Sequence, residues 1–167
     1  MSPSHEIRDP VSRVRQTFEM RGESLAVDNW LEPGGRLPPH YHPQQEERWS
    51  VLDGEVLFRH GKRERAIGPD AGEICVAPGE VHGLRNDTDR DAHLRCYVTP
   101  PLRLQQFLEE AADAGRQGLF TRRGLPRGLR GARWAASFLE RYRDETVFVS
   151  PPPIVQSVLI ALFARNL

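Results

Sequence analysis

The chain has 167 residues, 38% of them hydrophobic and 28% charged, and its 23 basic and 23 acidic side chains give a formal net charge of zero. This length accommodates one domain with an appendage and a sizeable buried core, and the composition excludes a disordered chain. The sequence opens without the basic and then apolar stretch of a signal peptide, so a cytoplasmic location is expected.

Short β-like runs dominate the first hundred residues. Residues 1–14 are polar and are expected to form a loose arm or an added edge strand. The runs that follow have the length and the bounding turn residues of strands. They cover residues 14–22, 24–32, 47–53, 55–59, 73–76, 84–86 and 92–99. Cys75 and Cys96 fall inside two of these apolar runs, which predicts buried free thiols without a disulfide.

A pair of histidines, His40 and His42, lies between the second and third runs. One residue separates them, so both imidazoles leave the same face of an extended chain, and the prolines around them keep this stretch out of a helix. A carboxylate, Glu47, follows five residues after His42, and a third histidine, His82, must arrive through the fold. Imidazoles with a carboxylate suit a first-row divalent metal. We therefore predict a metal site; separate surface histidines in a proline-rich loop are the alternative.

The spacing of these residues resembles the first motif of the cupins, which are small double-stranded β-helix, or jelly-roll, barrels. That motif reads G-x5-H-x-H-x(3 or 4)-E-x6-G, and Gly34, His40, His42, Glu47 and Gly54 match it in full. The resemblance implies a mainly β fold, a jelly-roll barrel of the small single-domain type. The helical pattern that follows the barrel adds C-terminal α-helices to this fold class.

The second cupin motif, G-x5-P-x-G-x2-H-x3-N, is matched in part. Gly79, His82 and Asn86 keep its spacing, whereas Gly72 lies one residue too close and Ala77 takes the usual proline position. This departure concerns the local turn more than the metal ligand, because His82 keeps its distance in sequence to both of its motif neighbours.

The resemblance covers about residues 20–100 and implies that His40, His42, Glu47 and His82 hold one divalent transition metal: Fe, Mn, Ni, Cu or Zn. These ligands would leave positions open on a six-coordinate ion for substrate or dioxygen. We expect a metal-dependent enzyme on a small organic substrate, in the first place an oxidoreductase of the dioxygenase type, with isomerases and lyases next. The alternative is a non-catalytic cupin that binds or senses a small ligand, because the fold does not choose among these activities.

Polar side chains alternate with apolar ones along residues 92–99. His93, Arg95 and Tyr97 share the polar face of this run. If that face lines the cavity, His93 and Tyr97 are candidate catalytic proton donors and Arg95 is a candidate substrate contact; the face could equally meet solvent or a dimer partner. Trp49 and Phe58 are candidate walls of the substrate pocket, although an aromatic side chain on a barrel strand can also belong to the core.

The pattern changes at Pro100, where helical spacing replaces the β-like runs. We therefore expect a cupin barrel with its N-terminal arm over residues 1–100 and a helical extension over residues 101–167. The extension is expected to pack on the barrel or on a partner subunit. Its helices are predicted over residues 102–114, 131–142 and 153–167, with a short β-like piece over residues 147–149.

Charge and hydropathy in the extension bear on the expected partners. Residues 116–143 contain eight arginines and one acid, a local charge of +7, for which a solvated basic face is expected. No nucleic-acid motif accompanies them, so no nucleic acid is expected as a partner. Residues 151–167 are apolar but too short to span a bilayer. We expect them to pack on the protein or within a homodimer, with contact to a membrane surface as the weaker alternative.

Overall fold

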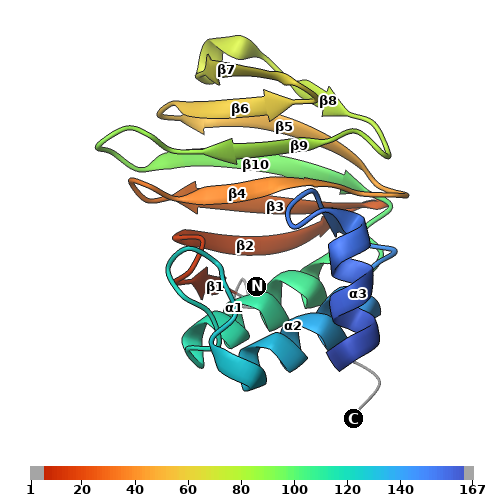
Figure 1. Ribbon diagram of the computed structural model, residues 1–167. Coiled ribbons are helices and arrows are strands. Elements are labelled where there is room, and N and C mark those ends of the chain that lie inside the picture. The colour runs from red at the N-terminus through yellow and green to blue at the C-terminus, as the bar shows by residue number, and fades with distance from the viewer. Residues whose placement is uncertain (1–5, 164–167) are drawn as a thin grey trace.

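Two antiparallel sheets form a barrel, and three helices pack at one end of it (Figure 1). This computed structural model describes residues 6–163. The six-stranded sheet has the order β1 (Glu6–Asp9), β2 (Val14–Arg21), β3 (Ser24–Leu31), β10 (Ala92–Thr99), β5 (Glu46–Asp53), β8 (Ile74–Val76). The five-stranded sheet has the order β11 (Val147–Phe148), β4 (Arg36–Tyr41), β9 (His82–Arg85), β6 (Val56–His60), β7 (Arg63–Ile67). The predicted jelly-roll fold with C-terminal helices is confirmed.

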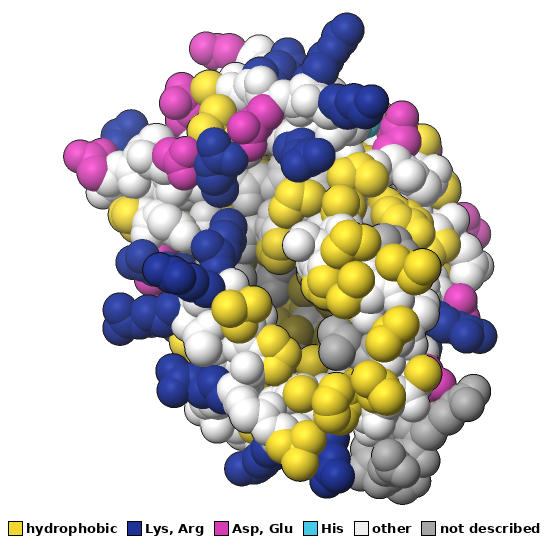
Figure 2. Space-filling view, in the orientation of Figure 1, with side chains coloured by type: hydrophobic (Ala, Val, Ile, Leu, Met, Phe, Trp, Pro, Cys, Tyr) yellow, Lys and Arg dark blue, Asp and Glu magenta, His cyan; other side chains and the backbone are white. Residues whose placement is uncertain are grey.

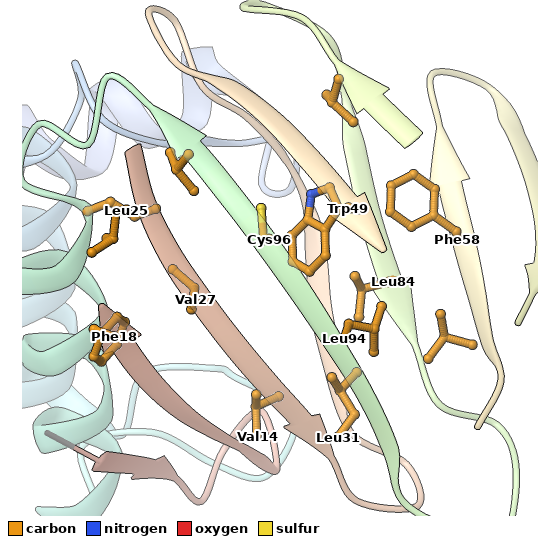
Figure 3. Close-up of a cluster of buried hydrophobic side chains, with 14 of the residues drawn as sticks. Val14, Phe18, Leu25, Val27, Leu31, Trp49, Phe58, Leu84, Leu94 and Cys96 are labelled. Atoms are coloured by element: carbon orange, nitrogen blue, oxygen red, sulfur yellow. The ribbon is translucent and has the colours of Figure 1, made fainter. Parts of the chain in front are cut away.

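The core lies between the sheets and is built by alternation along the strands. On β10, every second side chain is buried, beginning with Ala92. Leu94 and Cys96 face Val51 and Trp49 of the neighbouring strand β5 in the sheet register. Figure 3 shows Leu94, Cys96 and Trp49 beside side chains from the opposite sheet, among them Phe58 on β6.

The structure decides one open alternative of the sequence prediction and differs from it in two features. The polar arm does contain an edge strand, β1, which pairs with β2. Strand β7 was not predicted, because its sequence Arg-Glu-Arg-Ala-Ile lacks the alternation of a half-buried strand and four of its residues are exposed at the sheet edge. The prediction that both cysteines are buried is wrong for Cys75, which points outward from β8, and holds for Cys96.

Two of the three helices share one aromatic cluster that continues the barrel core. Helix α1 (Leu104–Arg116) lies against β1, and α2 (Gly128–Arg141) packs on α3 (Pro153–Phe163). Phe107 of α1 stacks near Phe138 of α2 with ring centroids 4.9 Å apart, and the fully buried Tyr142 closes the group at 5.4 Å from Phe107. All three belong to the same buried cluster as the barrel residues.

The last described helix, α3, is not buried to the extent that its apolar sequence predicts. Ile154, Val155, Val158 and Leu162 are between 43% and 76% exposed, and Figure 2 shows hydrophobic side chains gathered over this part of the molecule. The eight arginines of residues 116–143 are all exposed, as expected for a solvated basic face. Among the described residues, no helix is long and apolar enough to cross a membrane.

Candidate metal centre

Strand pairing brings the three predicted histidines together. His40 is the next-to-last residue of the extended, proline-containing strand β4, and His42 directly follows that strand. Strand β9 lies beside β4 with His82 opposite His40 in the register. Residues opposite each other in an antiparallel pair project their side chains to the same side. The histidine that is distant in sequence therefore arrives next to the local pair.

The three imidazoles form one buried cluster. Their ligand nitrogens all lie within 4.8 Å of one another, so one ion can reach all three after a small inward movement of the rings. The ring centroids of His40 and His82 are 4.4 Å apart, and those of His42 and His82 are 5.4 Å apart. His40 is 9% exposed, His42 3% and His82 1%. This cluster is consistent with a metal ion held inside the barrel.

Each imidazole is oriented by a backbone carbonyl. The Nδ1 atoms of His40, His42 and His82 lie 2.7, 2.6 and 3.0 Å from the carbonyl oxygens of Pro38, Glu145 and Glu80, respectively. Because a carbonyl oxygen only accepts hydrogen bonds, each Nδ1 carries the proton and donates it. Nε2, with its free lone pair, is then the atom that can bind a metal. In metal-bound histidines, the ring nitrogen that does not bind the metal usually donates a hydrogen bond to a carbonyl or carboxylate, and this bond fixes the orientation of the ring.

Glu47 lies directly against the histidines. Its Oε1 is 3.0 Å from Nε2 of His42, and its Oε2 is 2.8 Å from Nε2 of His82 and accepts a hydrogen bond of 2.7 Å from Nε1 of Trp49. Nε2 of His82 is buried without a hydrogen bond of its own. Lone pairs that face each other at such distances repel unless a cation lies between them. The donor set therefore fits a divalent metal ion, and whether Glu47 itself becomes a ligand stays a prediction.

The buried charges shift the pKa values of this group. Burial, together with the other two histidines, lowers the pKa of His40 well below the ordinary histidine value, so His40 is neutral. Burial opposes the charged form of His42, but the Glu47 carboxylate beside it prevails and raises the pKa of His42. Burial also opposes the Glu47 anion, yet His42 and His82 hold its pKa well below the ordinary value. The Glu47 carboxylate thus favours a proton on His42 over one on His40.

We expect metal affinity to rise with pH for this reason. A metal must displace the His42 proton, which is held to a higher pH than on a free histidine of pKa about 6.5. Affinity should therefore climb as pH rises through the raised pKa of His42 and level off above it. Calorimetric titration with Zn²⁺ in two buffers of different ionisation enthalpy measures the released protons, and we expect this release to decrease as the pH rises through the raised pKa of His42. Binding that is independent of pH and of buffer would contradict this assignment.

The motif glycines and asparagine build the scaffold beneath the centre. Asn86 is fully buried; its Nδ2 donates to the carbonyls of Leu31 and Arg90, and its Oδ1 accepts from the backbone N–H and the hydroxyl of Thr88. Its backbone carbonyl accepts from Gly34, which has a positive φ of 77°. The two motifs are thus joined directly, and Asn86 serves the turn rather than the metal.

The polar residues of β10 lie on the other face of the sheet. Glu47 is opposite Val98 in the register, so the centre shares its side of the sheet with the buried half of β10. His93 and Arg95 instead reach Asp28, both at 2.8 Å, and His93 stacks on Trp30 at 4.3 Å between centroids. These two residues thus share Asp28 as a partner on the outward-facing side of the sheet. Tyr97 alternates with them on that face, and the catalytic and substrate-binding roles proposed for all three remain predictions.

The two candidate pocket walls are placed in the core. Trp49 is 4% exposed and Phe58 is 1% exposed, and their rings meet edge to face at 6.3 Å. Trp49 also reaches the centre through its hydrogen bond to Glu47. It therefore has a defined position beside the centre, whereas Phe58 packs behind it.

Sequence reasoning missed one neighbour of the centre. The carbonyl that orients His42 belongs to Glu145, 103 residues away, and β11, which follows Glu145, pairs with β4 so that Phe148 faces His40. The sequence shows only a short β-like piece over residues 147–149 and gives no signal of its place. The structure adds this segment to the surroundings of the histidines.

Comparison with known proteins agrees with the fold and the motifs. Residues 30–99 match the family described as Cupin domain, so this chain carries a cupin domain, followed by C-terminal helices. Over 55 residues it is 36% identical to an oxidoreductase from Arthrobotrys oligospora, a match that covers 32% of this chain and 22% of that relative. The chain thus spans about a fifth of the length of that curated relative.

Solved structures with the same fold share little sequence with this chain. A double-stranded β-helix protein from Klebsiella pneumoniae superposes with a TM-score of 0.50 at 22% identity, over 57% of this chain and 84% of the other. A predicted oxalate decarboxylase from Thermotoga maritima gives 0.52 at 20% identity, covering 59% and 94%. An RmlC-like cupin from Shewanella frigidimarina gives 0.52 at 18%, covering 61% and 88%. At these identities the likeness establishes the fold alone.

Proposed function

We propose that this protein is a metal-dependent enzyme of the dioxygenase type that acts on a small organic substrate. The observation that carries the proposal is the convergence of three buried imidazoles whose Nδ1 atoms are all committed to carbonyls. In this proposal His40, His42 and His82 hold the ion through Nε2, and Glu47 becomes the fourth ligand. The oxidoreductase name of the relative from Arthrobotrys oligospora supports a redox reaction.

The role of each residue follows from its contacts. A bound divalent ion supplies a Lewis acid with open positions for substrate or dioxygen. The carbonyls of Pro38, Glu80 and Glu145 keep the imidazoles in the tautomer that can bind it. The Trp49 N–H fixes one oxygen of Glu47, which leaves the other to face His42. The near-complete burial of the cluster excludes bulk water.

This proposal is tested by turnover with the metal-loaded protein. The protein is purified without a histidine tag or chelator, loaded with Fe²⁺ under anaerobic conditions, and offered a panel of small organic acids and phenols with dissolved oxygen. We expect oxygen consumption and product formation that disappear in the double variant His40→Ala/His42→Ala. Stoichiometric metal without turnover of any compound would count against an enzyme of this type.

A second candidate is a non-catalytic cupin that binds or senses a small ligand. The observation that favours it is the closure of the centre, since all three histidines are at most 9% exposed. A ligand that raises the melting temperature of the metal-loaded protein and is recovered unchanged would support this function. Conversion of that ligand into a product would exclude it.

A further inference from the structure

One of the three contacts that orient the histidines comes from outside the barrel. Pro38 and Glu80, whose carbonyls serve His40 and His82, each lie two residues away from the histidine in the chain. The corresponding carbonyl for His42 belongs to Glu145, which follows α2, and the Thr146 hydroxyl lies 3.3 Å from the same ring nitrogen. The orientation of His42 is therefore set by the helical extension.

The Glu145 carbonyl is held in place by the side chain of the same residue. That carboxylate is 4% exposed and accepts hydrogen bonds of 3.2 and 3.3 Å from the backbone N–H and the Nε of Arg103, at the start of α1. The backbone N–H of Glu145 donates to the carbonyl of the fully buried Tyr142. Burying a carboxylate without such partners is unfavourable, so this contact holds the segment that follows α2 against the start of α1.

The residues after Glu145 attach the same segment to the metal-binding strand. Phe148 lies opposite His40 in the register, with 6.3 Å between ring centroids, and equally 6.3 Å from Phe107 of α1. The carbonyl of Phe148 accepts a 2.6 Å hydrogen bond from Gln156 of α3. Residues 145–148 thus contact two of the three histidines on one side and two helices on the other.

We propose that Glu145 is a positioning residue of the metal centre, and that through it the helical extension controls how tightly the centre holds its ion. This inference rests on the proposed metal-binding function and adds to it a dependence on residues 145–148. Without the Glu145 carboxylate, its carbonyl loses one of the contacts that hold it, and the orientation of the His42 ring is less firmly set. Loss of such an outer contact typically lowers metal affinity by about 10- to 100-fold.

The test uses Co²⁺ as the probe, because its visible absorption reports the geometry of its ligands. In Glu145→Ala we expect affinity for Co²⁺ to fall by about 10- to 100-fold and the absorption band to change. Glu145→Gln, which can still accept from Arg103, should recover part of the affinity. The matched control is Asp144→Ala, because that neighbouring carboxylate is 71% exposed and its nearest basic partner is 3.9 Å away. This control should bind Co²⁺ as the unaltered chain does.

The outcomes separate this inference from the proposed function. If the unaltered chain binds Co²⁺ and Glu145→Ala binds it equally well with the same spectrum, the inference is overturned and the metal site stands. If the unaltered chain binds no Co²⁺, the proposed function itself fails. Circular dichroism reports whether Glu145→Ala folds. If it does not, Phe148→Ala, which alters a partly exposed side chain of β11, takes its place, and an unchanged affinity there also overturns the inference.

Discussion

Substitution of His82 by alanine is expected to reduce the metal content of the protein from about one ion per chain to essentially none. His82 contributes a buried nitrogen from β9, the strand that pairs with β4 and places His82 opposite His40. Removing it leaves two imidazoles in the centre. Loss of an outer contact alone can lower metal affinity by roughly 100-fold, and we expect loss of a ligand to lower it at least as much. Elemental analysis of protein purified without a histidine tag or chelator measures the result.

The matched control for this variant is His60→Ala. His60 lies opposite His82 in the pairing of β6 with β9, but its side chain is 41% exposed and meets Glu80 at 3.0 Å outside the cluster. Its removal should leave the metal content unchanged. Full occupancy in His82→Ala would show that this histidine is not a ligand, and loss of metal in both variants would point to a general defect in folding.

Substitution of Phe58 by alanine should destabilise the protein by about 3–5 kcal/mol without removing the metal ligands. Phe58 is 1% exposed and packs edge to face against Trp49, so the variant leaves a cavity between the sheets. Thermal and urea unfolding measure the stability, and elemental analysis of the folded fraction measures the metal. We expect a large stability loss with unchanged metal content.

The comparison for Phe58→Ala is Leu52→Ala on β5, a hydrophobic residue that is 43% exposed. Surface substitutions of this kind usually change stability by about 0.5 kcal/mol or less. Wild-type stability of Phe58→Ala would show that this ring is not a core residue and would return it to the candidate walls of a substrate pocket.

The local parts of the candidate site could be predicted from the sequence because they depend on neighbours in the chain. The one-residue spacing of His40 and His42 on an extended stretch already places both on one face. His82 is 40 or more residues away, and only the motif that contains it connected it with the pair. Strand register then supplies the physical reason, since His82 lies opposite His40.

Other features depend on contacts that no local pattern records. The Glu145 carbonyl reaches His42 across 103 residues. Because every residue has a backbone carbonyl, the sequence does not indicate which of them makes this contact. The faces of β10 were separated correctly by alternation, but the position of Asp28 on the neighbouring strand could not be read from β10 itself. Strand β7 was missed because strand formation there comes from pairing with β6 rather than from hydrophobic residues.

The distance in sequence between His42 and Glu145 also bears on how the protein is made. A ribosome adds about 5–20 residues per second, so His42 emerges roughly 5–20 s before its acceptor 103 residues later. During that interval the nascent barrel presents imidazoles whose orientation is incomplete. We therefore expect stable insertion of an ion to follow translation of the extension, on a finished chain rather than on an emerging one.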